Sequence, residues 1–245
     1  MIRMNPLLVE AVRGISLGGT ASASYMNLLL LQAGVLVLWW PKLRLVDALE
    51  ANDGPMTLAA IVIAVGLCLA FQAARQGMEE VTGEEAATVH EWVHGTTLPI
   101  HRVVQGLLMA KCVQTFHNFV LSAPLIACAL ALAGTPWIPI VWCASIVVAQ
   151  AVTWGLVSTA VYWHVGHNQL LTYLTARLGL ATVYALTAVF VPALSAVRVP
   201  YDILDIGVEP LEPAFVFIAA HALLGIGACV VLISAFRRAR QSEAR

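Results

Sequence analysis

Six long apolar runs, almost free of charged residues, constrain this chain more than any other feature of its sequence. Each run has the length of a helix that crosses the hydrocarbon core of a bilayer, roughly 20 residues for about 30 Å. They lie at about residues 21–40, 55–74, 112–134, 137–163, 178–197 and 213–236. Only short loops and two longer polar stretches, 75–111 and 198–212, remain between them. We therefore expect one all-α membrane domain over residues 1–245, with six transmembrane helices.

The composition indicates the same class of protein. Of the 245 residues, 60% are hydrophobic and 11% are charged, whereas ordinary soluble domains have roughly 25% charged residues. The formal net charge is −1, so no strong positive field predicts binding to nucleic acid. The first apolar run is long enough to span a bilayer and no clear cleavage site follows it, which predicts a retained span and not a removed signal peptide.

The positions of the basic residues predict which ends face the cytoplasm, because Lys and Arg are retained on that side during insertion. Odd–even counting of six spans places the N-terminus, the 75–111 stretch, the turn after the fourth run and the C-terminus on one side. That side has ten of the 13 basic residues: Arg3, Arg13, Arg75, Arg102, Lys111, Arg177, Arg237, Arg238, Arg240 and Arg245. We expect a multi-pass protein of the cell membrane with both termini in the cytoplasm.

Two segments have the pattern of elements that lie along a membrane surface. In "MNPLLVEAVRG", Asn5 and Pro6 suit the cap and first position of a helix. One face of that helix is apolar and includes Leu7, Leu8, Ala11 and Val12, which predicts an N-terminal interfacial amphipathic helix. The stretch "VRVPYDILDIGVEPLEP" mixes acidic with apolar residues between the fifth and sixth runs. It predicts an interfacial or re-entrant element there.

The stretch "VHEWVHG" contains His90, Glu91 and His94 in the H-E-x-x-H order of zinc peptidases. On a helix the two histidines would bind zinc and Glu91 would act as the base that activates a water. The extended motif needs Gly and His where this chain has Thr97 and Ile100. The surrounding segment is also too acidic to be an intramembrane span. A solvated polar helix is the preferred interpretation, and a zinc-dependent membrane metalloprotease stays as an alternative.

Two motifs resemble those of the ABC-2-type permeases, the six-span membrane subunits of ATP-binding-cassette transporters. "NPLLVEAVRG" is similar to the opening amphipathic helix of that family. "GTTLPIHRVVQGLLMAK", residues 95–111, is similar to its cytoplasmic segment after span two, and Pro124 falls where such proteins often interrupt span three. The resemblance covers nearly the full length of the chain. It implies a transport subunit and not an enzyme, and the sequence contains no G-x-x-x-x-G-K-[ST] nucleotide loop.

The resemblance also implies the partners and the site residues. ATP and Mg²⁺ would be bound by a separate cytoplasmic ABC ATPase, with no cofactor in this chain, and the permease would pair with a second copy of itself or a homologous permease. The acidic segment between spans two and three would be a coupling helix that fits the ATPase. We expect five residues to make that contact: Glu84, Glu85, Glu91, Trp92 and Arg102.

Several polar residues fall inside the predicted spans, where polar groups usually face protein or water. Five of them are candidates for lining a transport pathway: Gln114, His117, Asn118, Gln150 and His221. Hydrogen bonding between helices is the other explanation for such residues. A third hypothesis follows from the histidines, namely a non-catalytic scaffold or cofactor-binding subunit that holds a metal or haem.

Overall fold

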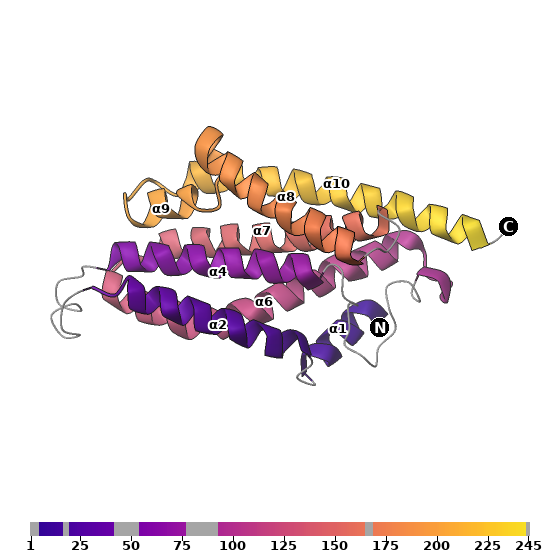
Figure 1. The fold of residues 1–245 in the computed structure, drawn as a ribbon, viewed down its shortest axis with the longest axis horizontal. Helices are drawn as coiled ribbons and strands as arrows, with labels where there is room; N and C mark the ends of the chain where they lie inside the picture. Colours follow the sequence, from indigo (N-terminus) through magenta and orange to yellow (C-terminus); the bar gives the residue numbers. More distant parts are fainter. Residues whose placement is uncertain (1–4, 17–19, 42–53, 77–92, 165–168, 244–245) are drawn as a thin grey trace.

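Every element in the described part of the computed structural model is helical (Figure 1). The structure describes residues 5–16, 20–41, 54–76, 93–164 and 169–243. Its elements are α1 (Pro6–Ser16), α2 (Thr20–Leu38), α4 (Pro55–Gln76), α6 (Ile100–Ala133), α7 (Trp137–His164), α8 (Gln169–Phe190), the 3₁₀ helix η1 (Pro192–Leu194), α9 (Arg198–Leu204) and α10 (Leu211–Glu243). The all-α class predicted from the sequence is thus confirmed.

Four helices are long and apolar enough to cross a membrane: Pro55–Arg75, Ile100–Ala133, Trp137–His164 and Leu211–Gln241. They correspond to the predicted spans two, three, four and six. Helices α2 and α8 contain shorter apolar stretches in the described residues, Tyr25–Leu38 and Leu174–Phe190. Four long apolar helices are consistent with a membrane-embedded protein, whereas the count of six spans stays a prediction.

Helix α4 forms the centre of the bundle and packs against α2, α6, α7 and α9. In its apolar stretch 72% of the residues are buried, compared with 28% for α6 and for α10. Gly66 of α4 faces α7, and a Cβ there would lie 2.5 Å from Gln150 Nε2 and 3.2 Å from a methyl group of Val147. Ser158 on α7 donates a hydrogen bond to the carbonyl of Ala74 near the end of α4. Small residues that permit close approach are typical of helix pairs in membranes.

Helix α6 begins much earlier than the sequence predicted. It starts at Ile100, not near residue 112, and runs without interruption through Pro124 to Ala133. After Pro99 the sequence has no residue that stops a helix for two turns, so the polar segment before the apolar run continues the same helix. Gly134 ends it with a left-handed φ of 58° and donates a hydrogen bond to the Leu130 carbonyl at 3.2 Å.

The chain after α8 also differs from the prediction. Helix α8 ends at Phe190, not at residue 197, and the following residues form η1 and α9. Helix α9 buries Val199, Pro200, Ile203 and Leu204, and it packs against α4 and α7. The polar interval predicted at 198–212 is therefore partly a short helix attached to the bundle, because its apolar residues recur at helical spacing.

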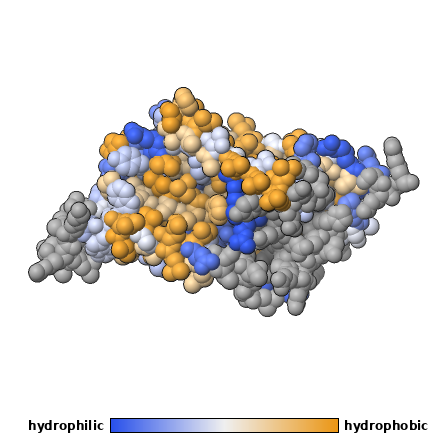
Figure 2. Space-filling model, viewed as in Figure 1, coloured by the Kyte–Doolittle hydropathy of each residue, from blue (hydrophilic) through white to orange (hydrophobic). Residues whose placement is uncertain are grey.

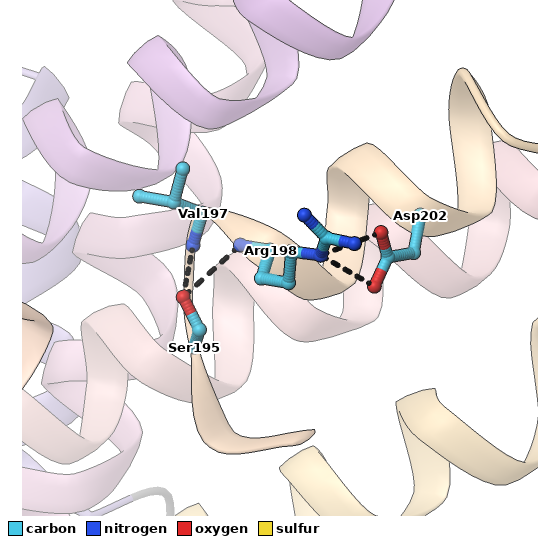
Figure 3. Close-up of polar contacts among 4 residues, drawn as sticks. All are labelled: Ser195, Val197, Arg198 and Asp202. Carbon is cyan, nitrogen blue, oxygen red and sulfur yellow. Dashed lines mark hydrogen bonds and ion pairs between the residues drawn. The ribbon is translucent and has the colours of Figure 1, made fainter. Parts of the chain in front are cut away.

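Polar contacts fix the start of α9, and Figure 3 shows them. Ser195, which is fully buried, accepts hydrogen bonds at its hydroxyl from the N–H groups of Val197 at 3.3 Å and Arg198 at 3.0 Å. The Arg198 guanidinium also binds the Asp202 carboxylate one turn later, at 2.9 Å. Ser195 thus satisfies backbone donors that the first turn of a helix leaves without partners.

The surface has the distribution expected of a membrane-embedded bundle. Figure 2 shows hydrophobic residues over much of the described face between the two ends. Hydrophilic residues lie toward the end of α10 that leads to the C-terminus, and a further hydrophilic group lies near the centre of this face. Large apolar side chains that are mostly exposed include Leu38, Leu178, Phe190, Phe215 and Leu223. Such an apolar surface is stable beside lipid and would be unfavourable in water.

Candidate functional site

At one end of the bundle α1, residues 93–111 and residues 232–240 of α10 pack together, and we call these residues the platform (Figure 1). Their apolar side chains form one cluster with the end of α7. Its buried members include Leu7, Val93, Val103, Leu107, Trp163, Leu232 and Phe236. Through this cluster the segment before α6 packs with residues of α1, α7 and α10.

Helix α1 is attached to the start of α6 through Asn5. Its side-chain oxygen accepts a hydrogen bond from the Leu7 N–H at 3.1 Å, so Asn5 caps α1 as predicted. Its side-chain nitrogen donates to the Arg102 carbonyl at 2.7 Å. Leu7 is completely buried against α6, where Gly106 leaves the space that α1 occupies. A Cβ on Gly106 would lie 2.5 Å from Asn5 Oδ1 and 2.8 Å from Leu7 Cβ.

The exposure of the α1 side chains differs from the single apolar face that the sequence predicted. Leu7 faces the protein, whereas Val9, Val12 and Arg13 are exposed. The predicted apolar face is therefore divided between contact with α6 and the outer surface. That division agrees with a helix at a membrane surface, which remains a prediction for this chain.

Arg240 connects the end of α10 to the segment that precedes α6. Its Nε donates a hydrogen bond to the Val93 carbonyl, and one terminal nitrogen donates to the Thr96 carbonyl at 3.2 Å. Hydrogen bonds from a charged donor are stronger than those between neutral groups. Residues 93–96 are therefore held to α10 although 147 and 144 residues separate the partners in the chain.

Three aromatic rings reinforce this attachment. His94 stacks on Trp163 at the end of α7, with ring centroids 6.5 Å apart and planes at 21°. Trp163 meets Phe236 of α10 edge to face, with centroids 4.6 Å apart. Edge-to-face and stacked pairs of this kind stabilise packed aromatic clusters. The segment before α6 thus contacts α7 and α10 through His94 and Trp163.

The predicted ATPase-contact residues are only partly within the described structure. Glu84, Glu85, Glu91 and Trp92 lie outside the described residues. Arg102 lies in the first turn of α6, where its side chain is exposed and its carbonyl binds Asn5. The segment that contains the other four leads directly into Val93, which is buried in the platform.

The zinc alternative also falls largely outside the described residues, because His90 and Glu91 are not among them. His94, the other proposed ligand, lies beside the Trp163 ring. Among the described residues no group of three or more His, Cys, Asp or Glu side chains could hold a metal ion.

Inside the bundle a polar network joins α2 to α6. The hydroxyls of Tyr25 and Ser122 are 2.6 Å apart, and Gln32 donates to Tyr25 Oη at 3.1 Å. All three side chains are completely buried. On α6, Ser122 continues a buried stripe at spacings of four and three residues: Lys111, Thr115, Asn118 and Ser122. The inward face of α6 is thus polar for three turns.

The five pathway candidates do not gather at one point. Asn118 is buried in the α6 stripe, while Gln114 and His117 are half-buried on neighbouring faces. Gln150 on α7 is buried and accepts a hydrogen bond from the Tyr184 hydroxyl of α8 at 3.4 Å. His221 on α10 stacks on Phe217 and has its Nδ1 3.0 Å from the Phe217 carbonyl. Gln150 thus takes part in a contact between helices, and the carbonyl of His221 also accepts a hydrogen bond from the Thr153 hydroxyl of α7 at 3.0 Å.

The sequence interpretation missed Lys111 as an interior residue. It was counted among the cytoplasmic basic residues, yet its side chain is 2% exposed. Its Cδ and the Ala73 carbonyl oxygen both lie within 3.5 Å of the position that a Cβ on Gly155 would take. Lys111 therefore lies between α7 and the last turn of α4, where the negative end of the helix dipole favours a cation. The spacing of Lys111, Thr115, Asn118 and Ser122 was the signal that could have identified this stripe.

Comparison with known proteins does not identify the chain. No family model, curated protein or solved structure matches it. The likeness to ABC-2-type permeases is therefore carried by the sequence motifs alone.

Proposed function

We propose that this chain is the membrane-spanning subunit of an ABC transporter of the ABC-2 type. A separate cytoplasmic ATPase binds ATP and Mg²⁺, and this chain pairs with a second permease, either a second copy or a homologue, to move a substrate across the cell membrane. In this proposal the chain crosses the membrane six times, and the platform and both termini lie in the cytoplasm. Most of the basic residues fall on that side, as the positive-inside rule requires.

The platform is the observation that carries the proposal. The acidic segment expected to meet the ATPase ends at Val93, and from there the chain is fixed to α10 by Arg240 and to α7 by the His94–Trp163 stack. A packed interior moves as a unit and does not absorb displacement as a loose loop does. Movement of the acidic segment would consequently pass to α6, α7 and α10 together, which is the lever that coupling to an ATPase requires.

Co-purification in mild detergent tests the proposal directly. The native chain is expected to bring a P-loop ATPase with it, and Glu91→Lys and Trp92→Ala are expected to release that ATPase. Glu209→Lys is the matched control, because Glu209 is an exposed glutamate that precedes α10, whose other end belongs to the platform. Capture of no ATPase, together with about one zinc per chain that is lost in His90→Ala, would replace the proposal with the peptidase.

A further inference from the structure

The end of α10 distributes three arginines over two different faces. The helix buries Ala228, Leu232 and Phe236, at spacings of four residues, and Arg240 follows on the same face. Val230, Val231 and Ser234 are exposed, and Arg237 and Arg238 follow on that outer face. Because residues three and four positions apart are neighbours on a helix, both arginines lie directly after the exposed apolar surface.

The two outer arginines differ from Arg240 in their contacts. Arg240 is committed to the carbonyls of Val93 and Thr96. Arg237 and Arg238 are exposed, and neither makes a hydrogen bond or an ion pair with any residue in the described ranges. Among the described residues, two adjacent and exposed guanidinium groups thus lie at the place where an apolar helix face ends.

We propose that Arg237 and Arg238 bind the phosphate groups of anionic phospholipids in the membrane leaflet beside the platform. A guanidinium group donates two parallel hydrogen bonds to a phosphate, and it is more weakly hydrated than an ammonium group. Basic residues immediately beyond a membrane-spanning helix attract anionic lipids, with a strength that falls within a Debye length of the surface. The inference needs only that α10 crosses the membrane, so it is independent of the proposed ATPase partner.

The position of the arginines favours lipid over a protein partner. Val230 and Val231 lie two turns before Arg237 and Arg238 on the outer face, about 10 Å along the helix axis, and they are exposed apolar residues that suit acyl chains. The same lipid molecule can therefore place its tails beside the valines and its headgroup beside the arginines. An acidic protein surface would pair with the arginines but would not cover the exposed valines two turns before them.

Photo-crosslinking of the full chain in vesicles tests this site. A photoreactive residue, p-benzoylphenylalanine, replaces Ser234, which is exposed one turn before the arginines. The vesicles contain equal amounts of phosphatidylglycerol and phosphatidylcholine, and mass spectrometry identifies the crosslinked lipid. We expect the anionic lipid to be enriched roughly fivefold or more for each arginine. The double variant Arg237→Ser/Arg238→Ser should bring the ratio close to one, and 0.5 M salt should reduce it.

Two single variants, each of which removes one positive charge elsewhere, serve as controls. Arg240→Ser alters the inner face of α10, and Arg198→Ser alters an exposed arginine in α9, at the other end of the bundle (Figure 1). Both should keep the enrichment. A ratio near one in the native chain, or an unchanged ratio in the double variant, overturns the proposal. If the ratio is near one and the double variant instead weakens capture of the ATPase, the arginines belong to a protein interface.

Discussion

Replacing Gly106 with alanine should detach α1 from the bundle. The added Cβ would lie 2.5 Å from Asn5 Oδ1 and 2.8 Å from Leu7 Cβ, and neither distance is tolerated between non-bonded atoms. Rotation of the Asn5 side chain would relieve the first contact but would lose its hydrogen bond to the Arg102 carbonyl. The second contact involves a Cβ, which moves only with its backbone, so α1 itself must move.

The cost follows from the contacts that α1 would lose. Burial of a leucine side chain contributes about 1.5–3 kcal/mol, and the lower end applies to Leu7 because α1 can move into the lipid surface. The hydrogen bond from Asn5 to the Arg102 carbonyl of α6 contributes about 1 kcal/mol. The higher helix propensity of alanine stabilises α6 by up to about 1 kcal/mol and offsets part of this cost. We expect α1 docking to weaken by about 1.5–2.5 kcal/mol, which is roughly 10- to 70-fold in the docking equilibrium.

Hydrogen exchange of the α1 backbone amides measures this equilibrium. An isolated helix of this length is marginal in water, so released α1 should lose protection. Gly227→Ala is the matched control, because nothing lies within 4 Å of the position that its Cβ would take. Exchange in α1 that stays as slow in Gly106→Ala as in the control would refute the packing argument.

Three further perturbations address other parts of the molecule. Arg240→Gln removes two charge-assisted hydrogen bonds and should lower the free energy of unfolding by about 1–2 kcal/mol, measured by denaturation in mixed micelles. The variant should still capture the ATPase but should lose transport. Tyr25→Phe removes the hydroxyl that pairs with Ser122 and accepts from Gln32, and it leaves Ser122 with its 3.4 Å hydrogen bond to the Asn118 carbonyl. The substitution should cost about 1–2 kcal/mol in the same assay, with part of it recovered when Ser122→Ala is added. The hydrogen bond to Asp205 and the charge of that carboxylate raise the pKa of Tyr201 above its ordinary value. Asp205→Asn should therefore shift the tyrosinate absorbance titration to lower pH, with Tyr201→Phe identifying the signal; an unmoved curve would show that the carboxylate is not the cause.

The apolar runs predicted most of the described helices because their ends coincide with strong local signals. The run at 55–74 became α4, which starts at Pro55, and the run at 137–163 became α7 after a Gly-Thr-Pro turn. The bounds of a helix differ from those of the apolar run where no such signal exists. Hydropathy changes near residue 112, but the backbone does not, so α6 begins at Ile100. Hydropathy indicates which residues are stable beside lipid. The end of a helix is indicated by helix-stopping residues.

The contacts between distant segments were not predictable in the same way. Tyr25 and Ser122 are separated by 97 residues in the chain, and each alone has the appearance of an ordinary polar residue within a span. Arg240 was assigned only to the cytoplasmic charge pattern, since nothing local distinguishes it from Arg237 and Arg238. Periodicity does separate them once α10 is known to bury Leu232 and Phe236, because Arg240 alone continues that face.

The contact between Arg240 and Val93 also sets an order for biosynthesis. A ribosome makes Val93 147 residues before Arg240, which corresponds to an interval of roughly 7–30 s at ordinary rates of synthesis. During that interval α4, α6 and α7 can enter the bilayer and pack. The carbonyls of Val93 and Thr96 cannot yet accept hydrogen bonds from Arg240, because Arg240 has not been made. The segment that precedes α6 therefore reaches its final position only after α10 has been made, which makes it one of the latest parts of the fold to form although it belongs to the first half of the chain.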